Sequence, residues 1–488
     1  MQYLRSAVLA SAALTAALSL PAQTILPGPG KYMASVTVKV YVAGKLSHYK
    51  GEMYLIDPLT LKAQALTLPS FLGKVGLNSI TEISPVMGYV TTIDGAPGTS
   101  PPSRGDLYRY ILAGTKANLT KLNTKPFTGG NLAQVAQIGA DLYVCSQDSA
   151  NQNGYLWSVP VLGGAPKLLV DFNKIPGYAG LANALTVFNG KLYLATWPSG
   201  KPTKNQLWEY DPAAKKITKV MELPKGLYST YVYPVHLTVD QKRRTLVLIG
   251  LYRDIVHIDP VTKKVVQYMA GNHRTSTGKP YYYNFLNSGT YNPDTGDIAL
   301  GTRRGGMDLL TGSHGALDLV PGVGSGPKSY HNSVTGLAYF PVGGHCVTYG
   351  DGGLGSPAAA TYRFWPIQVN LGLPMAGGSF GFHLHNATGG APALLFLGVS
   401  KSSWGGIPLP FDLGLLGAPG NFLRCSGEAI LTLTAAGRGP GKGKAEVRIP
   451  SIPLSARGST LYSQWLILDQ GANALGLVVS NARESLVR

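Results

Sequence analysis

The sequence has 488 residues, of which 44% are hydrophobic and 14% charged, with 62 glycines and 34 prolines. The hydrophobic content excludes general disorder, and the length allows more than one hydrophobic core. Lys and Arg exceed Asp and Glu by 42 to 24, a net charge of +18 that attracts polyanions such as acidic glycans. No nucleic-acid recognition motif accompanies this charge, so a specific nucleic-acid partner is not expected.

The N-terminal segment, residues 1–22, has the pattern of a cleavable secretory signal peptide. Arg5 precedes an apolar run from Ala7 to Leu20, which is followed by Pro21, Ala22 and Gln23. A membrane anchor is the alternative, but this run of about 14 residues is shorter than the roughly 20 that cross a bilayer. No later segment reaches spanning length. The sequence therefore predicts a secreted chain, extracellular or periplasmic, with no membrane span after cleavage.

Residues 30 to 371 repeat at intervals of about 50 residues. A four-residue strand signature recurs in seven copies: ASVT from Ala34, NSIT from Asn78, NLAQ from Asn131, NALT from Asn183, VHLT from Val235, NSGT from Asn287 and NSVT from Asn332. A second strand column lies downstream of each signature, in three copies before an Asp-Pro turn (IDPLT, YDPAA, IDPVT). Seven copies of three or four short strands predict an all-β, seven-bladed β-propeller over residues 23–371.

This pattern resembles the broad superfamily of secreted seven-bladed β-propellers. The chain shows no WD, kelch or Asp-box series, so the resemblance implies architecture and no particular activity. A large β-sandwich is the alternative, but sandwiches lack such a sequence period. The N-terminal stretch ILPGPGKYMASVT is a candidate for the strand that closes the ring, because propellers often join their ends to protect sheet edges.

Residues 372–488 change texture to Gly-rich turns and short alternating strands, which predict a C-terminal β-sandwich. The segments GFHLHNATGGAPALLFLGVS, PLPFDLGLLGAPGNF and QWLILDQGANALGLVVSNA resemble the C-terminal β-rich module of exported planctomycete-type proteins. That resemblance implies export and a modular role. Only Cys425 is present where such a module has a cysteine pair. Cys145 and Cys346 lie in apolar strands and are expected to be buried, inert thiols.

The first position of the strand signature is the first candidate site. In a propeller the innermost strand of each blade lines the central channel, so five asparagines are expected at its mouth: Asn78, Asn131, Asn183, Asn287 and Asn332. Their amides suit sugar hydroxyls, water or a hard cation. The alternative is that a repeated Asn bonds neighbouring backbone and closes each blade turn.

The last three repeats depart most from the pattern. Their leading loops, YSTYVYPVH, PYYYNFLN and KSYHN, bring tyrosine and histidine towards the channel, and Arg253 and Arg303 lie in neighbouring loops. A guanidinium that neutralises a carboxylate beside an unprotonated Tyr or His is what uronate β-elimination requires. Arg303 or Arg253 is the candidate neutraliser, and Tyr283, Tyr330 and His331 are the candidate base and acid. Tyr231, His236 and Arg253 are further candidate ligand-binding residues. Aromatic packing and surface salt bridges are the alternatives.

Three functions follow from these features. The first is an exported, non-catalytic propeller that binds an extracellular glycan, envelope polymer or protein at its channel face, with the C-terminal module as an accessory. The second is a polysaccharide lyase acting on an acidic carbohydrate at that face. The third is a hydrolase or lactonase with one divalent cation among the channel asparagines, although no carboxylate stands in that column. No other cofactor and no metal site are expected, since the HLH motif at His383 lacks a third ligand.

Overall fold

The structure is a computed structural model that describes most of the chain after residue 30. The described residues are 31–42, 45–57, 62–84, 86–93, 105–127, 130–148, 153–178, 180–197, 205–225, 232–241, 243–270, 285–303, 306–311, 314–320, 332–339, 345–349, 352–359, 362–363 and 366–488. The predicted signal peptide, residues 1–22, lies outside them. Strands dominate, and only short 3-10 helices interrupt them: η1 (Ser70–Gly73), η2 (Phe172–Lys174), η3 (Leu413–Leu416) and η4 (Leu454–Ala456). No helix in these ranges is long and apolar enough to cross a membrane.

The first part of the chain forms six four-stranded antiparallel sheets, which we call blades 1 to 6. Blade 1 contains β24 (Asn332–Tyr339), β1 (Tyr32–Val42), β2 (Lys45–Asp57) and β3 (Lys62–Ala65). Blade 2 contains β4 (Gly76–Ser84), β5 (Met87–Ile93), β6 (Leu107–Ala113) and β7 (Lys116–Lys121). Blade 3 contains β8 (Asn131–Ile138), β9 (Asp141–Asp148), β10 (Asn153–Pro160) and β11 (Lys167–Asp171).

The other three blades follow in chain order. Blade 4 contains β12 (Leu181–Phe188), β13 (Lys191–Trp197), β14 (Gln206–Asp211) and β15 (Lys216–Glu222). Blade 5 contains β16 (Pro234–Asp240), β17 (Thr245–Gly250), β18 (Asp254–Asp259) and β19 (Lys264–Ala270). Blade 6 contains β20 (Leu286–Tyr291), β21 (Ile298–Thr302), β22 (Met307–Thr311) and β23 (His314–Val320). In each blade the first-named strand is the innermost one.

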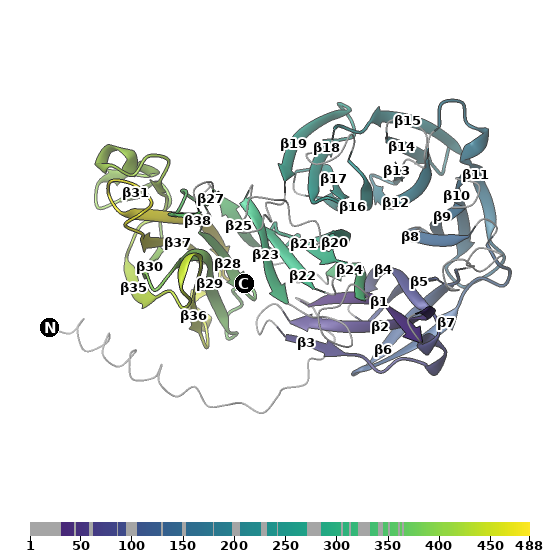
Figure 1. The fold of residues 1–488 in the computed structure, drawn as a ribbon, viewed down its shortest axis with the longest axis horizontal. Coiled ribbons are helices and arrows are strands. Elements are labelled where there is room, and N and C mark those ends of the chain that lie inside the picture. The colour runs from purple at the N-terminus through teal and green to yellow at the C-terminus, as the bar shows by residue number, and fades with distance from the viewer. Residues whose placement is uncertain are drawn as a thin grey trace.

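The six blades stand around one axis (Figure 1). Each innermost strand contacts that of the next blade, in the order β24, β4, β8, β12, β16 and β20, and β20 contacts β24 again. This ring is the arrangement of a β-propeller. The apolar sides of neighbouring blades pack together, as when Met33 and Leu55 of blade 1 join one buried cluster with Val90 and Tyr110 of blade 2.

The expectation of seven blades is wrong, because the described residues form six. The signature copies at Ala34 and Asn332 were counted as two blades, but β1 and β24 pair side by side in blade 1, from Tyr32 opposite Tyr339 to Val38 opposite Asn332. The expectation that the N-terminal stretch supplies a closing strand is confirmed by this pairing. A strand from each end of the repeat region therefore belongs to one sheet, which joins the two ends of the ring.

The second part of the chain forms one five-stranded sheet, one three-stranded sheet and three two-stranded ribbons. The five-stranded sheet has the order β25 (His345–Tyr349), β38 (Leu477–Leu486), β37 (Thr460–Leu468), β30 (Pro392–Gly398) and β35 (Ala429–Thr434). The three-stranded sheet has the order β28 (Ile367–Leu371), β29 (Phe380–Gly389) and β36 (Gly439–Ile449). Three two-stranded ribbons complete it: β26 (Pro357–Ala359) with β27 (Tyr362–Arg363), β31 (Ser403–Trp404) with β32 (Ile407–Pro408), and β33 (Phe411–Asp412) with β34 (Phe422–Leu423).

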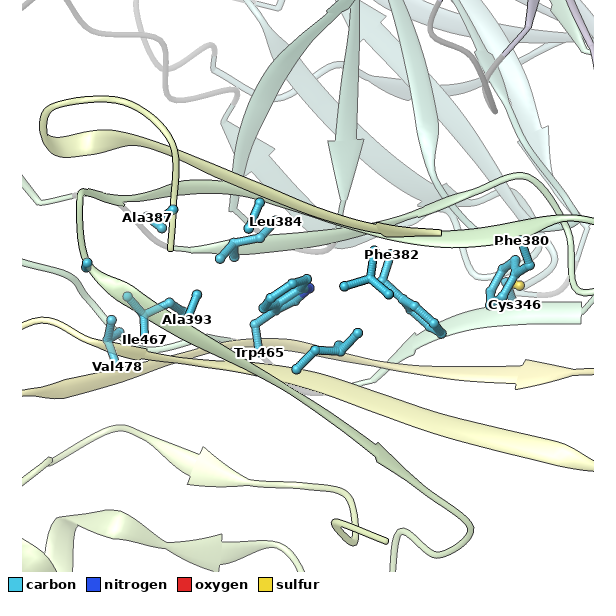
Figure 2. Packing of buried hydrophobic residues seen from close by; sticks show 14 of the residues in the cluster. Cys346, Phe380, Phe382, Leu384, Ala387, Ala393, Trp465, Ile467 and Val478 are labelled. Atoms are coloured by element: carbon cyan, nitrogen blue, oxygen red, sulfur yellow. The ribbon is translucent and has the colours of Figure 1, made fainter. Parts of the chain in front are cut away.

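One buried cluster lies between these two sheets (Figure 2). Phe380, Phe382 and Leu384 alternate along β29 and meet Trp465 and Ile467 of β37. This alternation buries one face of each strand, as expected for sheets packed face to face.

The sheets of the second part begin before residue 372 and contact the propeller. β25 and β28 precede residue 372 but pair with β38 and β29, so the change of sheet lies near residue 340 rather than at the predicted boundary of 371/372. Ile367 and Val369 of β28 pack into the cluster of blade 1 that contains Tyr32 and Tyr339. The second part is therefore joined to the propeller by a continuous hydrophobic contact.

Candidate functional site

A pocket of about 290 Å³ lies on the propeller axis, at the end where the innermost strands begin. All six innermost strands contribute to its lining, which consists of Asn78, Ala133, Gln134, Gln147, Leu181, Asn183, Val235, His236, Asn287, Arg303 and Thr335. Side chains that are far apart in the chain, from Asn78 to Thr335, thus converge because each blade begins at the same end of the channel.

Every innermost strand has a break in its pairing register where it lines the pocket. The residues skipped in the pairing are Asn78, Ala133 with Gln134, Asn183, Val235, Asn287 and Thr335. Such β-bulges bend a strand and re-aim the extra side chain. In four blades the skipped residue is the first one of the sequence signature, whereas in blades 1 and 3 the break falls further along the strand, at Thr335 and at Ala133 with Gln134. The skipped residues of every blade line the pocket.

Three of these bulge residues bond the next blade. Asn78 Nδ2 donates to the carbonyl of Leu132, Asn183 Nδ2 donates to that of Pro234 at 2.6 Å, and Thr335 Oγ1 donates to that of Leu77 at 2.5 Å. Each accepting carbonyl immediately precedes the bulge of the neighbouring innermost strand. These contacts satisfy polar groups on the channel-side edge of the inner strands, so Asn78 and Asn183 link neighbouring blades. The alternative to ligand binding predicts a bond that closes a blade turn, and the observed bonds instead join one blade to the next.

Asn287 departs from this pattern because it faces an arginine. Its Oδ1 accepts a hydrogen bond from Arg303 Nε at 2.9 Å, and the Arg303 guanidinium lies 5.7 Å from the centre of the Phe285 ring. The backbone N–H of Arg303 donates to the Phe285 carbonyl at 2.8 Å. Arg303 is exposed, and partial desolvation of its guanidinium lowers its pKa from the ordinary value, yet an arginine remains charged near neutrality.

Gln134 and His236 form the buried side of the pocket. Gln134 Oε1 accepts from the backbone N–H groups of Leu185 at 2.9 Å and Leu237 at 3.1 Å, which fixes the orientation of its amide. Its Nε2 therefore donates to His236 Nε2, 3.0 Å away, and the neutral imidazole carries its proton on Nδ1. Burial lowers the pKa of His236 to about 3, so this histidine is uncharged at neutral pH.

Arg303 is the one charged side chain among the described residues that line the pocket. The rest of the polar lining consists of amides, a hydroxyl and a neutral imidazole. The guanidinium can bind a carboxylate, and the neighbouring amides and hydroxyl can donate hydrogen bonds to sugar hydroxyls and accept hydrogen bonds from them. The pocket therefore suits a sugar that carries a carboxylate. His236 is not available as a general base in this arrangement, because its unprotonated nitrogen accepts from Gln134.

The structure brings five of the predicted site residues to the pocket: Asn78, Asn183, His236, Asn287 and Arg303. Asn131 begins β8 opposite Gln147 and does not line the pocket, because the bulge of that strand falls at Ala133 and Gln134. Arg253 lies away from the pocket in a buried ion pair with Asp308 of blade 6, at 2.6 Å, so its place is structural.

The remaining predictions fall outside the description. Tyr231, Tyr283, Tyr330 and His331 lie outside the described residues. Asn332 is the first residue of β24, where the bulge falls at Thr335, and its side chain is outside the description.

Sequence reasoning missed Gln134, Gln147 and Thr335. Gln134 was visible as a departure, since it stands at the fourth position of the signature, where every other copy has Thr. Gln147 donates from Nε2 to Asn183 Oδ1 and so closes the pocket between blades 3 and 4. Nothing in the local sequence of β9 marks this residue, because the contact depends on how adjacent blades pack.

The other candidate groups lie in buried surroundings. His383 Nδ1 and His385 Nε2 are 3.1 Å apart on one face of β29, and burial is the main cause that lowers the pKa of His383 to about 4. Within the described residues no three His, Cys, Asp or Glu side chains gather as a metal site would require. All three cysteines are buried and free, which agrees with the prediction for Cys145 and Cys346.

Comparisons with known proteins do not assign the chain to a family. No family model and no curated protein matches it. Among solved structures it is similar to the WD40 β-propeller domain of Doa1, at 14% identity over 48% of this chain and 78% of that domain, with a TM-score of 0.30. A likeness this low carries no conclusion about function, and the propeller assignment rests on the strand topology described above.

Proposed function

We propose that this chain is an exported β-propeller that binds an acidic extracellular glycan or envelope polymer at its channel pocket. The observation that supports this most is the position of Arg303, a cation that contacts Asn287 and Phe285 in a lining whose other polar side chains are uncharged. The net charge of +18 also favours an anionic ligand, because it attracts polyanions to the surface. In this proposal the second part of the chain is an accessory β-sandwich module, and the export signal lies in residues 1–22.

A panel of polymers tests the proposal. We expect polygalacturonate or alginate to retard the purified chain in affinity electrophoresis and neutral dextran to leave it unretarded. Arg303→Gln is expected to weaken binding at least about tenfold, because a charge-assisted hydrogen bond contributes about 1.5–3 kcal/mol. Arg457→Gln, which removes an exposed arginine beside η4, is the matched control and should bind like the parent chain.

Binding of dextran and of the acidic polymers with equal affinity would refute the proposal. If Arg303→Gln and Arg457→Gln weaken binding to the acidic polymers equally, the proposal is also refuted. That result would indicate non-specific attraction of the polymers to the basic surface.

Lyase activity at the same face is the second candidate. It is favoured by the same arginine, since β-elimination from a uronate requires a cation on the carboxylate. The distinguishing measurement is the ultraviolet absorbance of unsaturated uronate products during incubation with the acidic polymers. Turnover that disappears in Arg303→Gln and His331→Ala supports the lyase, whereas retention without product supports the binding module. Release of reducing ends or ring-opened lactone without unsaturated product would indicate a hydrolase or lactonase instead.

A further inference from the structure

A row of three aromatic rings begins beside Arg303. The guanidinium lies over Phe285, the Phe285 ring meets Tyr252 edge-on with centroids 5.3 Å apart, and Tyr252 meets Tyr233 edge-on at 5.5 Å. All three rings are half-buried. Each therefore retains surface towards solvent, and the two tyrosines carry hydroxyl groups that both donate and accept hydrogen bonds.

The row lies at the same end of the propeller as the pocket. Tyr233 and Phe285 immediately precede the innermost strands β16 and β20, and Tyr252 lies in the turn between β17 and β18. Backbone hydrogen bonds tie these segments together, from the N–H of Leu286 to the carbonyl of Leu251 at 3.0 Å and from the N–H of Leu251 to the carbonyl of Tyr233 at 2.8 Å. The positions of the rings are thus fixed before any ligand binds.

The pocket and the row differ in what they can hold. At about 290 Å³ the pocket is at the lower end of the roughly 300–1,000 Å³ typical of ligand sites, so it suits a small group such as one sugar unit. Phe285, Tyr252 and Tyr233 do not line the pocket. They lead from its edge at Arg303, in blade 6, towards blade 5.

We infer that the binding site continues from the pocket across Tyr252 to Tyr233, so that the ligand is recognised as a chain of acidic sugar units and not as a single unit. Arg303 and the channel amides bind one uronate in the pocket, and the aromatic row contacts the neighbouring units, whose apolar ring faces pack on aromatic side chains. This inference rests on the proposed function, because it takes the pocket as the place where the first unit binds.

Ligand length tests the inference without any substitution. We expect the trimer of galacturonic acid to bind the parent chain at least about tenfold more tightly than the monomer. Tyr252→Ala should remove most of this difference by weakening trimer binding while leaving the monomer affinity unchanged, and Tyr252→Phe should restore most of the trimer affinity. Tyr155→Ala, which removes a half-buried tyrosine ring beside Trp157 in blade 3, is the matched control and should retain the difference.

The possible results distinguish failure of the aromatic row from failure of the proposed function. Equal affinity for monomer and trimer, with both weakened by Arg303→Gln, overturns the aromatic row and leaves the pocket in place. A length preference that survives in Tyr252→Ala overturns it as well. Failure of both ligands to bind the parent chain overturns the proposed function and this inference together. Thermal melting of each variant shows whether the substituted chain is folded, and Tyr252→Leu replaces Tyr252→Ala if it is not.

Discussion

Arg483 on β38 ties the second part of the chain to the propeller, and its removal should destabilise the fold strongly. The side chain is completely buried, and its Nη2 donates to both carboxylate oxygens of Asp297, at 2.9 and 3.1 Å. Its Nη1 donates to the carbonyl of Thr295 at 3.2 Å, and its Nε faces the carbonyl of Gln368 at 3.4 Å. One guanidinium thus links the β20–β21 loop of blade 6 to β28 and β38.

The size of the expected loss of stability follows from the burial of Asp297, the partner of Arg483. The Asp297 side chain is 3% exposed, so Arg483→Met leaves a carboxylate in the interior without its counter-charge. Breaking a buried ion pair in this way costs about 3–5 kcal/mol, whereas replacing both partners by apolar residues is often close to neutral. The double substitution Asp297→Leu with Arg483→Met should therefore be more stable than Arg483→Met alone.

Urea unfolding followed by tryptophan fluorescence measures this loss. The adjacent residue offers a control, because Glu484 pairs with Lys401 at 2.7 Å through a lysine side chain that is 51% exposed. Lys401→Met should cost less than about 1 kcal/mol, as exposed ion pairs usually do. A loss for Arg483→Met no greater than that for Lys401→Met would show that the buried ion pair does not stabilise the fold, and so would a double substitution at least as destabilising as Arg483→Met alone.

Three further predictions concern the buried polar groups. Because burial lowers the pKa of His236 from 6.5 to about 3, the unfolded chain takes up a proton there before the folded one does, and the free energy of unfolding should fall as pH drops below about 6.5. The fall should be shallower in His236→Gln, which urea titrations at several pH values would reveal. Gln134→Leu should cost about 2–4 kcal/mol in the same assay, since two backbone N–H groups lose their acceptor, and a loss below about 1 kcal/mol would contradict that role. A thiol reagent should modify the native chain far more slowly than the urea-unfolded chain, because burial raises the pKa of three thiols to about 12, 11 and 12: Cys145, Cys346 and Cys425.

The repeat made the propeller predictable, but it did not reveal the number of blades. Seven copies of a strand signature indicated repeated blades correctly, because every blade has an innermost strand with a break in its pairing register near the pocket. The copies at Ala34 and Asn332 belong to one sheet, and pairing between strands from opposite ends of the repeat region leaves no mark in either local sequence. A repeat count therefore overstates the blade number when the two chain ends share a blade.

The candidate site also depends on strand pairing that local sequence does not reveal. Asn183, Asn287 and Arg303 were predictable because they stand at fixed positions relative to the inner strands. Asn131 was misplaced because the bulge of β8 falls further along the strand, at Ala133 and Gln134, and bulge positions depend on the pairing register. Arg253 was taken for a ligand-binding residue, but its partner Asp308 comes from another blade, and such a contact is visible only in three dimensions.

The central claim is that Arg303 selects the carboxylate of a sugar ligand in the channel pocket. The most direct measurement is calorimetric titration of the parent chain and Arg303→Gln with two trimers of the same length, galacturonic acid and its carboxyl-reduced form, galactose. We expect the parent chain to bind the acidic trimer at least about tenfold more tightly than the neutral one and Arg303→Gln to abolish this preference. Equal binding of the two trimers by the parent chain, or a preference that persists in Arg303→Gln, would contradict the central claim.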